Sequence, residues 1–178
     1  MDSAADVRGW PLVITARPKK FALHMVSFLI NYSLVMKPPP KGWPRLTVGL
    51  FYEDAKAAID WLCNAFGFDM QLVVEGEGDR IEHSQLVFGG AMVMVGSAGR
   101  EGRDVFCSPK SVDGKNTHGL CICVDDVDAH CERARKAGAK ISMEPTTTDY
   151  GEDYWADRTY QAIDPEGVAW WFLQRVRG

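Results

Sequence analysis

Few side chains in this 178-residue chain have the type and spacing that catalysis or metal binding requires. The four histidines, His24, His83, His118 and His130, form neither an HExxH motif nor a His-x-His pair. His83 is the strongest polar candidate, because it stands two residues before Gln85 in an alternating stretch and both side chains would point to one face of a strand. The competing interpretation is that His83 has a structural role only, as a strand residue hydrogen-bonded to a neighbouring side chain.

The five cysteines contain no CxxC pair, and their odd number fits free thiols in a reducing compartment, so we expect a cytoplasmic protein. Cys121 and Cys123 would project from the same face of a strand, as a redox or nucleophilic pair does. No base or cation adjacent in the sequence would lower the pKa of these thiols. We therefore favour the interpretation that Cys121 and Cys123 act as small, buried hydrophobic residues.

The composition describes an ordinary globular protein. Hydrophobic residues make up 46% and charged residues 25% of the chain, enough to bury a core. The net charge is −4: residues 1–45 carry a net charge of +5, and the residues after Arg45 carry −9. An acidic body argues against a nucleic-acid surface, whereas cationic or neutral ligands remain possible.

Two similar stretches of sequence define the elements that must position these side chains. Residues 46–52 alternate as a strand does, Glu53 and Asp54 supply a helix cap, and Gly67 ends the helix. About 72 residues later, residues 120–124 alternate, an acidic pair follows, and Gly138 ends a second helix. The recurrence indicates an internal duplication.

Each copy continues with three more predicted strands. In the first copy, Gly89 and Gly90 form a tight hairpin turn between two of them. In the second, residues 164–167 (DPEG) have the residue order of a turn. The pattern predicts an α+β fold of two tandem βαβββ modules at residues 45–97 and 118–176, joined by a linker at residues 98–117.

The polyproline break at residues 38–40 separates the domain at residues 43–178 from an N-terminal extension at residues 1–42. Met36 raises the hypothesis that translation begins there. The apolar residues 21–36 are too short and too polar for a membrane span, so a helix packing on the body or on a second subunit is the alternative.

The order and spacing of four segments carry a resemblance to a known family. The segments are FYEDAKAAIDWLCNAFGF (residues 51–68), IEHSQLVFGGAMVMVG (81–96), CVDDVDAHCERARKAGA (123–139) and DPEGVAWWF (164–172). Together they resemble the vicinal oxygen chelate superfamily, which includes glyoxalase I, bleomycin resistance proteins and extradiol dioxygenases. The match covers about residues 45–175 and is nearest to the metal-free, bleomycin-resistance-like members.

The resemblance implies an open, curved mixed sheet, an incomplete barrel with helices outside, which binds a ligand in its concavity and forms a homodimer. Strand alternation then assigns the side chains that would face this cavity. The predicted ligand-binding residues are Phe51, His83, Gln85, Met92, Met94, Cys121, Trp155, Gln161 and Trp171.

Metal-binding members of the family take ligands from the first and last strand of each module. In this sequence those positions fall on Thr47, Met94, Gly119 and Trp171, none of which offers an imidazole or carboxylate. We therefore expect no metal and no cofactor at this site. A register slip of one residue would replace Gly119 by His118.

The leading hypothesis is a small-molecule-binding protein that holds a hydrophobic or aromatic ligand without a catalytic metal and has no nucleic-acid or membrane partner. The alternative is a metal-dependent lyase, isomerase or ring-cleaving dioxygenase that uses His83 or His118 with Asp157. A third reading makes residues 21–36 the interface of a partner-binding module. The sequence leaves ligand turnover open.

Overall fold

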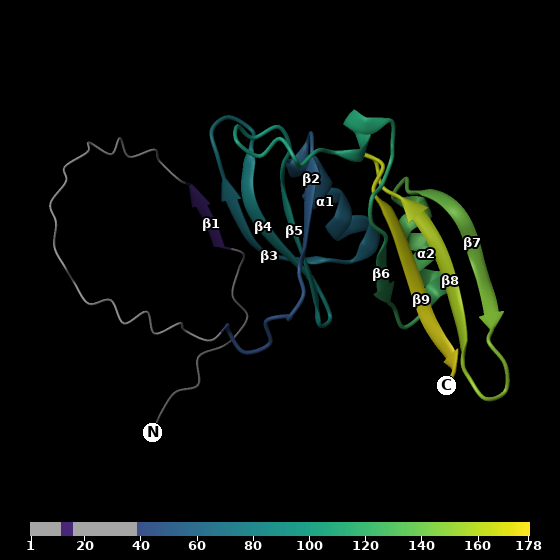
Figure 1. Cartoon of the computed structure of the whole chain (residues 1–178). Coiled ribbons are helices and arrows are strands. Elements are labelled where there is room, and N and C mark those ends of the chain that lie inside the picture. Colours follow the sequence, from purple (N-terminus) through teal and green to yellow (C-terminus); the bar gives the residue numbers. More distant parts are fainter. Residues whose placement is uncertain (1–11, 16–38) are drawn as a thin grey trace, which may run out of the picture.

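The computed structural model describes residues 12–15 and 39–178 (Figure 1). Residues 21–36, the predicted alternative helix, lie outside the described residues. The elements in chain order are β1 (Leu12–Thr15), β2 (Val48–Tyr52), α1 (Ala55–Phe66), β3 (Asp69–Glu75), β4 (Ile81–Phe88), β5 (Ala91–Ser97), a 3-10 turn η1 (Pro109–Val112), β6 (Leu120–Cys123), α2 (Val127–Lys136), β7 (Lys140–Asp149), β8 (Ala156–Ile163) and β9 (Ala169–Arg177).

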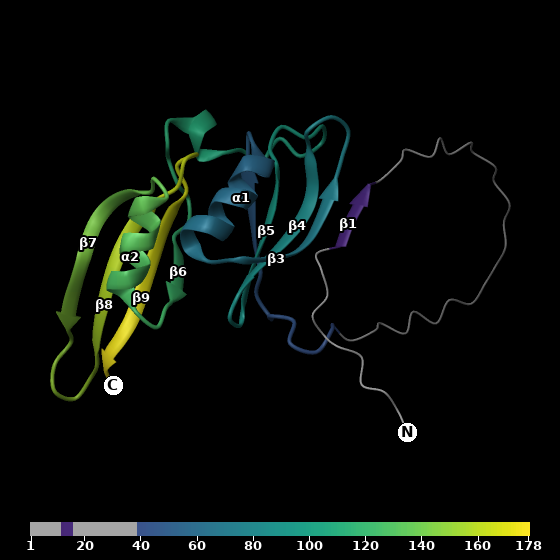
Figure 2. The same cartoon turned by 180° about the vertical axis from the view of Figure 1, so that it is seen from behind.

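The two predicted modules are present, each with a helix beside its own sheet. The first sheet has the strand order β1-β3-β4-β5-β2, and the second has the order β6-β9-β8-β7. In both sheets the strand before the helix pairs in parallel with the last strand of its module. The prediction of two α+β modules whose sheets do not close into a barrel is confirmed, and the view from behind shows both helices beside their sheets (Figure 2).

The helix caps form as the sequence predicts. Asp54 accepts a hydrogen bond from the backbone N–H of Ala57 at 3.0 Å, and Asp126 does the same for Ala129 at 2.9 Å. Gly67 ends α1 with a φ of 81°, a left-handed conformation that glycine adopts without strain.

Three boundaries differ from the sequence prediction. The first strand of the domain begins at Val48, so Leu46 does not pack under α1 and is 80% exposed. Residues 98–117 contain η1, which Ser108 caps. The N-terminal extension contributes β1, which pairs in parallel with β3 and adds a strand to the edge of the first sheet.

One hydrophobic core serves both modules. Phe66, at the end of α1, is fully buried, and its ring centroid lies 5.3 Å from that of Trp170 and 4.8 Å from that of Phe172, both in β9. The two helices also contact each other. Because the side chains on the helix side of both sheets meet in this core, the opposite face of each sheet is left free of helices.

A buried polar joint links the modules at the DPEG turn. Asp164 accepts hydrogen bonds from the Tyr52 hydroxyl at 2.7 Å and from Trp170 Nε1 at 3.1 Å. Burial raises the pKa of Asp164 above its usual value, although these hydrogen bonds act in the opposite direction. Glu166 accepts from the backbone N–H groups of Glu53 and Asp54, and this fixes the turn against the start of α1.

None of the helices among the described residues is long and apolar enough to cross a membrane.

Candidate functional site

The predicted site residues other than Trp155 lie in strands, on the faces of the two sheets that the helices do not cover. We call the face that carries Phe51, His83, Gln85, Met92 and Met94 the first open face. Their neighbours Leu50, Leu86, Val93 and Val95 belong to the hydrophobic core, and Ser84, between His83 and Gln85, is buried. The hairpin pairing is as predicted, with Val87 opposite Met92 and Phe88 opposite Ala91.

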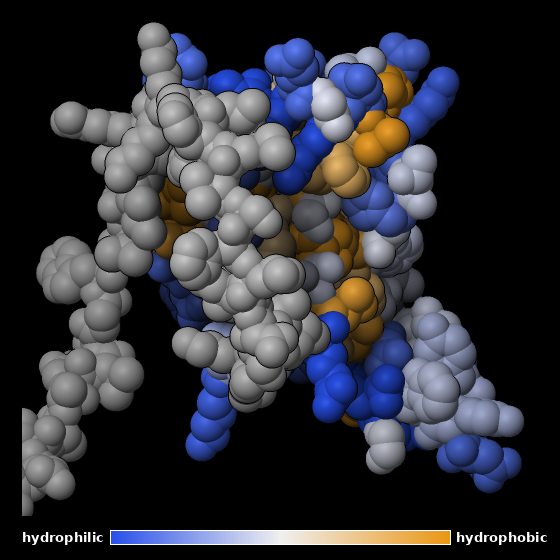
Figure 3. Space-filling view, turned by 60° about the vertical axis from the view of Figure 1, so that its left-hand side comes forward, coloured by the Kyte–Doolittle hydropathy of each residue, from blue (hydrophilic) through white to orange (hydrophobic). Residues whose placement is uncertain are grey.

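The first open face is mostly apolar. Met92 is only 5% exposed but does not belong to the shared core, and Met94 and Phe51 are half-buried. The space-filling view shows hydrophobic surface in the middle of the visible part and again at its upper right, with hydrophilic residues between and around them (Figure 3). Such a surface favours burial of an apolar ligand.

His83 and Gln85 supply the polar part of this face. Their side-chain nitrogens, His83 Nε2 and Gln85 Nε2, lie 3.2 Å apart. An amide nitrogen only donates, so Gln85 Nε2 is the donor and His83 Nε2 the acceptor in this contact. His83 is therefore held by its neighbour on the strand, and its other ring nitrogen, Nδ1, remains free of this contact.

Phe51 is covered by a residue that sequence reasoning missed. The ring of Phe106, in residues 98–117, stacks on the ring of Phe51 with centroids 4.4 Å apart and planes 16° apart. A cleft of about 540 Å³ adjoins this stack, and its lining includes Val112, His118 and Val168. The only available signal was the apolar pair Val105 and Phe106 within a hydrophilic linker.

The second open face carries Cys121, Trp171 and Gln161 in one row across three neighbouring strands, because Cys121 pairs with Trp171 and Trp171 with Gln161. Gln161 Oε1 accepts a hydrogen bond from the Ser142 hydroxyl at 2.7 Å. Cys121 and Cys123 are exposed, so the interpretation as small buried residues is wrong in this chain. Partial burial, together with the nearby Cys123 and Asp157, raises the pKa of the Cys121 thiol above its usual value.

Trp155 lies just before β8, where its carbonyl accepts a hydrogen bond from the Tyr150 N–H at the base of the β7–β8 hairpin loop, rather than in a strand. The Arg175 guanidinium lies over its ring at 5.0 Å, and the ring of Tyr150 lies 5.6 Å from it. Arg177, which the sequence did not single out, holds the loop by donating to the carbonyls of Gly151 and Tyr154.

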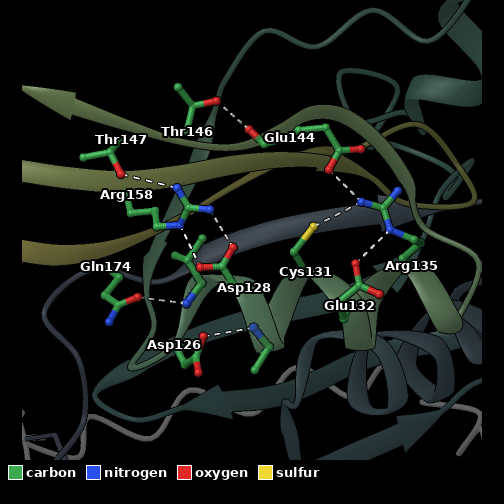
Figure 4. A network of polar contacts seen from close by, with 12 residues as sticks. Asp126, Asp128, Cys131, Glu132, Arg135, Glu144, Thr146, Thr147, Arg158 and Gln174 are labelled. Carbon is green, nitrogen blue, oxygen red and sulfur yellow. Dashed lines mark hydrogen bonds and ion pairs between the residues drawn. The ribbon is translucent and has the colours of Figure 1, made fainter.

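The acidic and basic groups near the second face are paired with each other. Asp157 is buried and forms an ion pair with Arg175. Arg158, on the helix side, forms a two-pronged ion pair with Asp128 at 2.6 and 2.7 Å (Figure 4). A charge that is already paired is a weak candidate for catalysis.

The chain brings its predicted site residues together as two groups rather than one. His83 contacts Gln85 on the first open face, whereas Cys121, Trp171 and Gln161 form their row on the second. Within the described part of the chain, no hydrogen bond or aromatic contact joins one group to the other. The predicted residues therefore form two groups, one on the open face of each sheet.

The four positions at which the resemblance implies metal ligands do not fit a divalent ion. Thr47 precedes β2, Met94 supplies a thioether, and the Trp171 indole lies 3.9 Å from where a side chain on Gly119 would begin. His118, the alternative to Gly119, lines the cleft beside Phe51 instead. Across residues 39–178, no three His, Cys, Asp or Glu side chains are grouped as a metal site would require.

Comparison with known proteins places this fold in a family. An uncharacterized protein of Mycobacterium bovis is 31% identical over 140 residues, which span 75% of this chain and 85% of that protein. The crystal structure of TioX from Micromonospora sp. ML1 is 33% identical, with a TM-score of 0.58 over 74% of this chain and 98% of TioX. TnmS3, an antibiotic binding protein from Streptomyces sp. CB03234, shares the fold at 21% identity, with a TM-score of 0.50 over 72% of this chain and 93% of TnmS3.

The model of the glyoxalase/bleomycin resistance protein/dioxygenase superfamily matches residues 45–172. These residues contain both βαβββ modules and both open faces. The chain belongs to this superfamily.

Proposed function

We propose that this protein binds a hydrophobic or aromatic small molecule and sequesters it without a catalytic metal. The observation that carries the proposal is the first open face, where Phe51, Met92 and Met94 lie on the same side of the sheet as the contact between His83 and Gln85. Burial of about 100 Å² of apolar ligand surface contributes about 2.5 kcal/mol, and the polar pair would orient the ligand.

A second copy of the chain would complete the cavity. In this arrangement the first open face of one copy would meet the second open face of another, so that each face supplies half of the cavity. A two-fold axis would then create two equivalent cavities in one homodimer. Trp171 would supply an aromatic surface opposite Met92 and Met94.

The negative net charge of the domain favours cationic ligands. Residues after Arg45 carry a net charge of −9, which attracts cations toward the protein. The shared fold with TnmS3, an antibiotic binding protein, supports the use of this scaffold for small-molecule capture. A flat, cationic, aromatic compound is therefore the ligand class to test first.

The test is a thermal-shift screen of the full chain against bleomycin and a panel of planar aromatic cations. A ligand present at 100 times its Kd stabilises the folded state by about 2.7 kcal/mol, which is easily measured as a rise in Tm. The variants Met94→Ala and Trp171→Ala should lose that rise. Val176→Ala, an exposed apolar residue near the C-terminus, is the matched control and should keep it.

Two results would overturn the proposal. The first is the absence of stabilisation by every compound at high concentration. The second is a stoichiometric divalent metal in the purified protein, measured by elemental analysis, which would favour the metal-dependent lyase, isomerase or dioxygenase instead.

A further inference from the structure

Two thiols stand side by side on the second open face. Cys121 and Cys123 alternate with Ile122, which is buried in the core, so their side chains project from the same side of β6. Both are exposed, and all five cysteines, which lie in the described part of the chain, are free of disulfide bonds. Because β6 is the edge strand of the second sheet, the pair is open to solvent on the side that has no neighbouring strand.

The spacing of the pair argues against a disulfide bond. Residues i and i+2 of a strand lie about 6.6 Å apart on one face. A disulfide requires its two Cβ atoms to be within about 4.5 Å, which the extended backbone of β6 prevents. A bridging ion has a longer reach, since two metal–sulfur bonds of about 2.3 Å separate the sulfurs by about 4.6 Å.

The surroundings select the kind of ion. The neighbours of the two thiols in β9 are Trp171 and Leu173, which offer no hard oxygen ligand. Asp157 is engaged by Arg175, and across residues 39–178 no third His, Cys, Asp or Glu completes a metal group here. Four-coordinate zinc is therefore disfavoured, whereas a soft ion that accepts two sulfur ligands fits.

We propose that Cys121 and Cys123 form a two-thiolate binding site for a soft monovalent cation of the Cu(I) type. On binding, each S–H bond breaks, two protons leave to solvent, and two metal–sulfur bonds form, so one ion replaces two protons without any change of oxidation state. The site does not coincide with the four family metal positions. Cys121 is also a predicted ligand-binding residue and pairs with Trp171, so the two proposals concern neighbouring parts of the second open face.

The test is competition for Cu(I) under anaerobic, reducing conditions, with the full chain and the coloured Cu(I) complex of bicinchoninate as the probe. The wild-type chain should remove one Cu(I) per chain from the complex. Cys121→Ser and Cys123→Ser should each weaken binding by about 100-fold or more, because the second thiolate acts as an intramolecular ligand. Melting curves of the two variants should show that both remain folded.

Cys107→Ser is the matched control, because Cys107 is also exposed but lies in the linker, away from β6. It should compete as the wild type does. The proposal is refuted if Cys107→Ser loses binding as strongly as the β6 variants, if the β6 variants retain it, or if native mass spectrometry finds one ion for every two chains.

Discussion

Removal of the Phe66 side chain should destabilise both modules at once. Phe66 belongs to the first module but packs on Trp170 and Phe172 of the second, and its ring also lies 4.9 Å from that of Trp61. Truncation of a fully buried phenylalanine to alanine costs about 3–5 kcal/mol. A single domain has only about 5–15 kcal/mol of stability, so Phe66→Ala should remove a large part of it.

The measurement is urea unfolding, followed in parallel by tryptophan fluorescence and far-UV circular dichroism. With a loss of about 4 kcal/mol and an m-value of about 2 kcal/mol/M, the midpoint should fall by about 2 M. Both probes should report the same single transition, since one core serves both modules. Phe66→Leu keeps most of the apolar volume and should cost about 1–2 kcal/mol through lost aromatic contacts.

The control is Leu46→Ala, whose side chain is 80% exposed and should change stability by less than about 0.5 kcal/mol. Two separate unfolding transitions in Phe66→Ala, with only the first module destabilised, would contradict the shared core. A urea midpoint of Phe66→Ala equal to that of Leu46→Ala would also contradict the shared core.

Three further predictions concern stability. Burial lowers the pKa of His130, so the folded state binds a proton at this residue less readily than the unfolded state does. The contribution of His130 to the free energy of unfolding should therefore be fully present above about pH 6.5 and be lost as the pH falls below that value. In His130→Gln, Tm should depend less on pH over this range. Ser108→Ala removes the 2.6 Å hydrogen bond to the buried Glu166 carboxylate and should cost about 1–3 kcal/mol in urea unfolding, whereas a cost near zero would contradict the buried joint. Gly67→Ala should lower Tm more than Gly138→Ala, although both glycines have positive φ. The Cβ added at position 67 would lie 2.6 Å from the Arg133 guanidinium and displace it from the carbonyls of Cys63 and Asn64, whereas the Cβ added at position 138 meets no atom within 4 Å; equal shifts in Tm would refute this cost.

The sequence predicted the elements whose signals are local. The caps at Asp54 and Asp126, the stop at Gly67 and the hairpin at Gly89 depend on a few neighbouring residues, and all of them form. Alternation along β4 also predicted that His83 and Gln85 share a face, as they do.

The missed features depend on contacts between distant segments. Phe106 covers Phe51 and Arg177 holds the hairpin loop, although neither lies in a motif. The exposure of Cys121 could not be deduced from alternation, because alternation assigns a face but not what covers it. Nor did any period in the N-terminal extension indicate that residues 12–15 pair with β3.

The division of the site between two open faces has a consequence for mixtures of variants. In the proposed dimer, a chain altered only at Met94 and a chain altered only at Trp171 each form homodimers in which both cavities are damaged. A dimer of one chain of each kind combines the intact first face of one with the intact second face of the other. Mixing two inactive proteins should therefore restore capture of ligand in one cavity of each mixed pair, and dilution that separates the chains should release it.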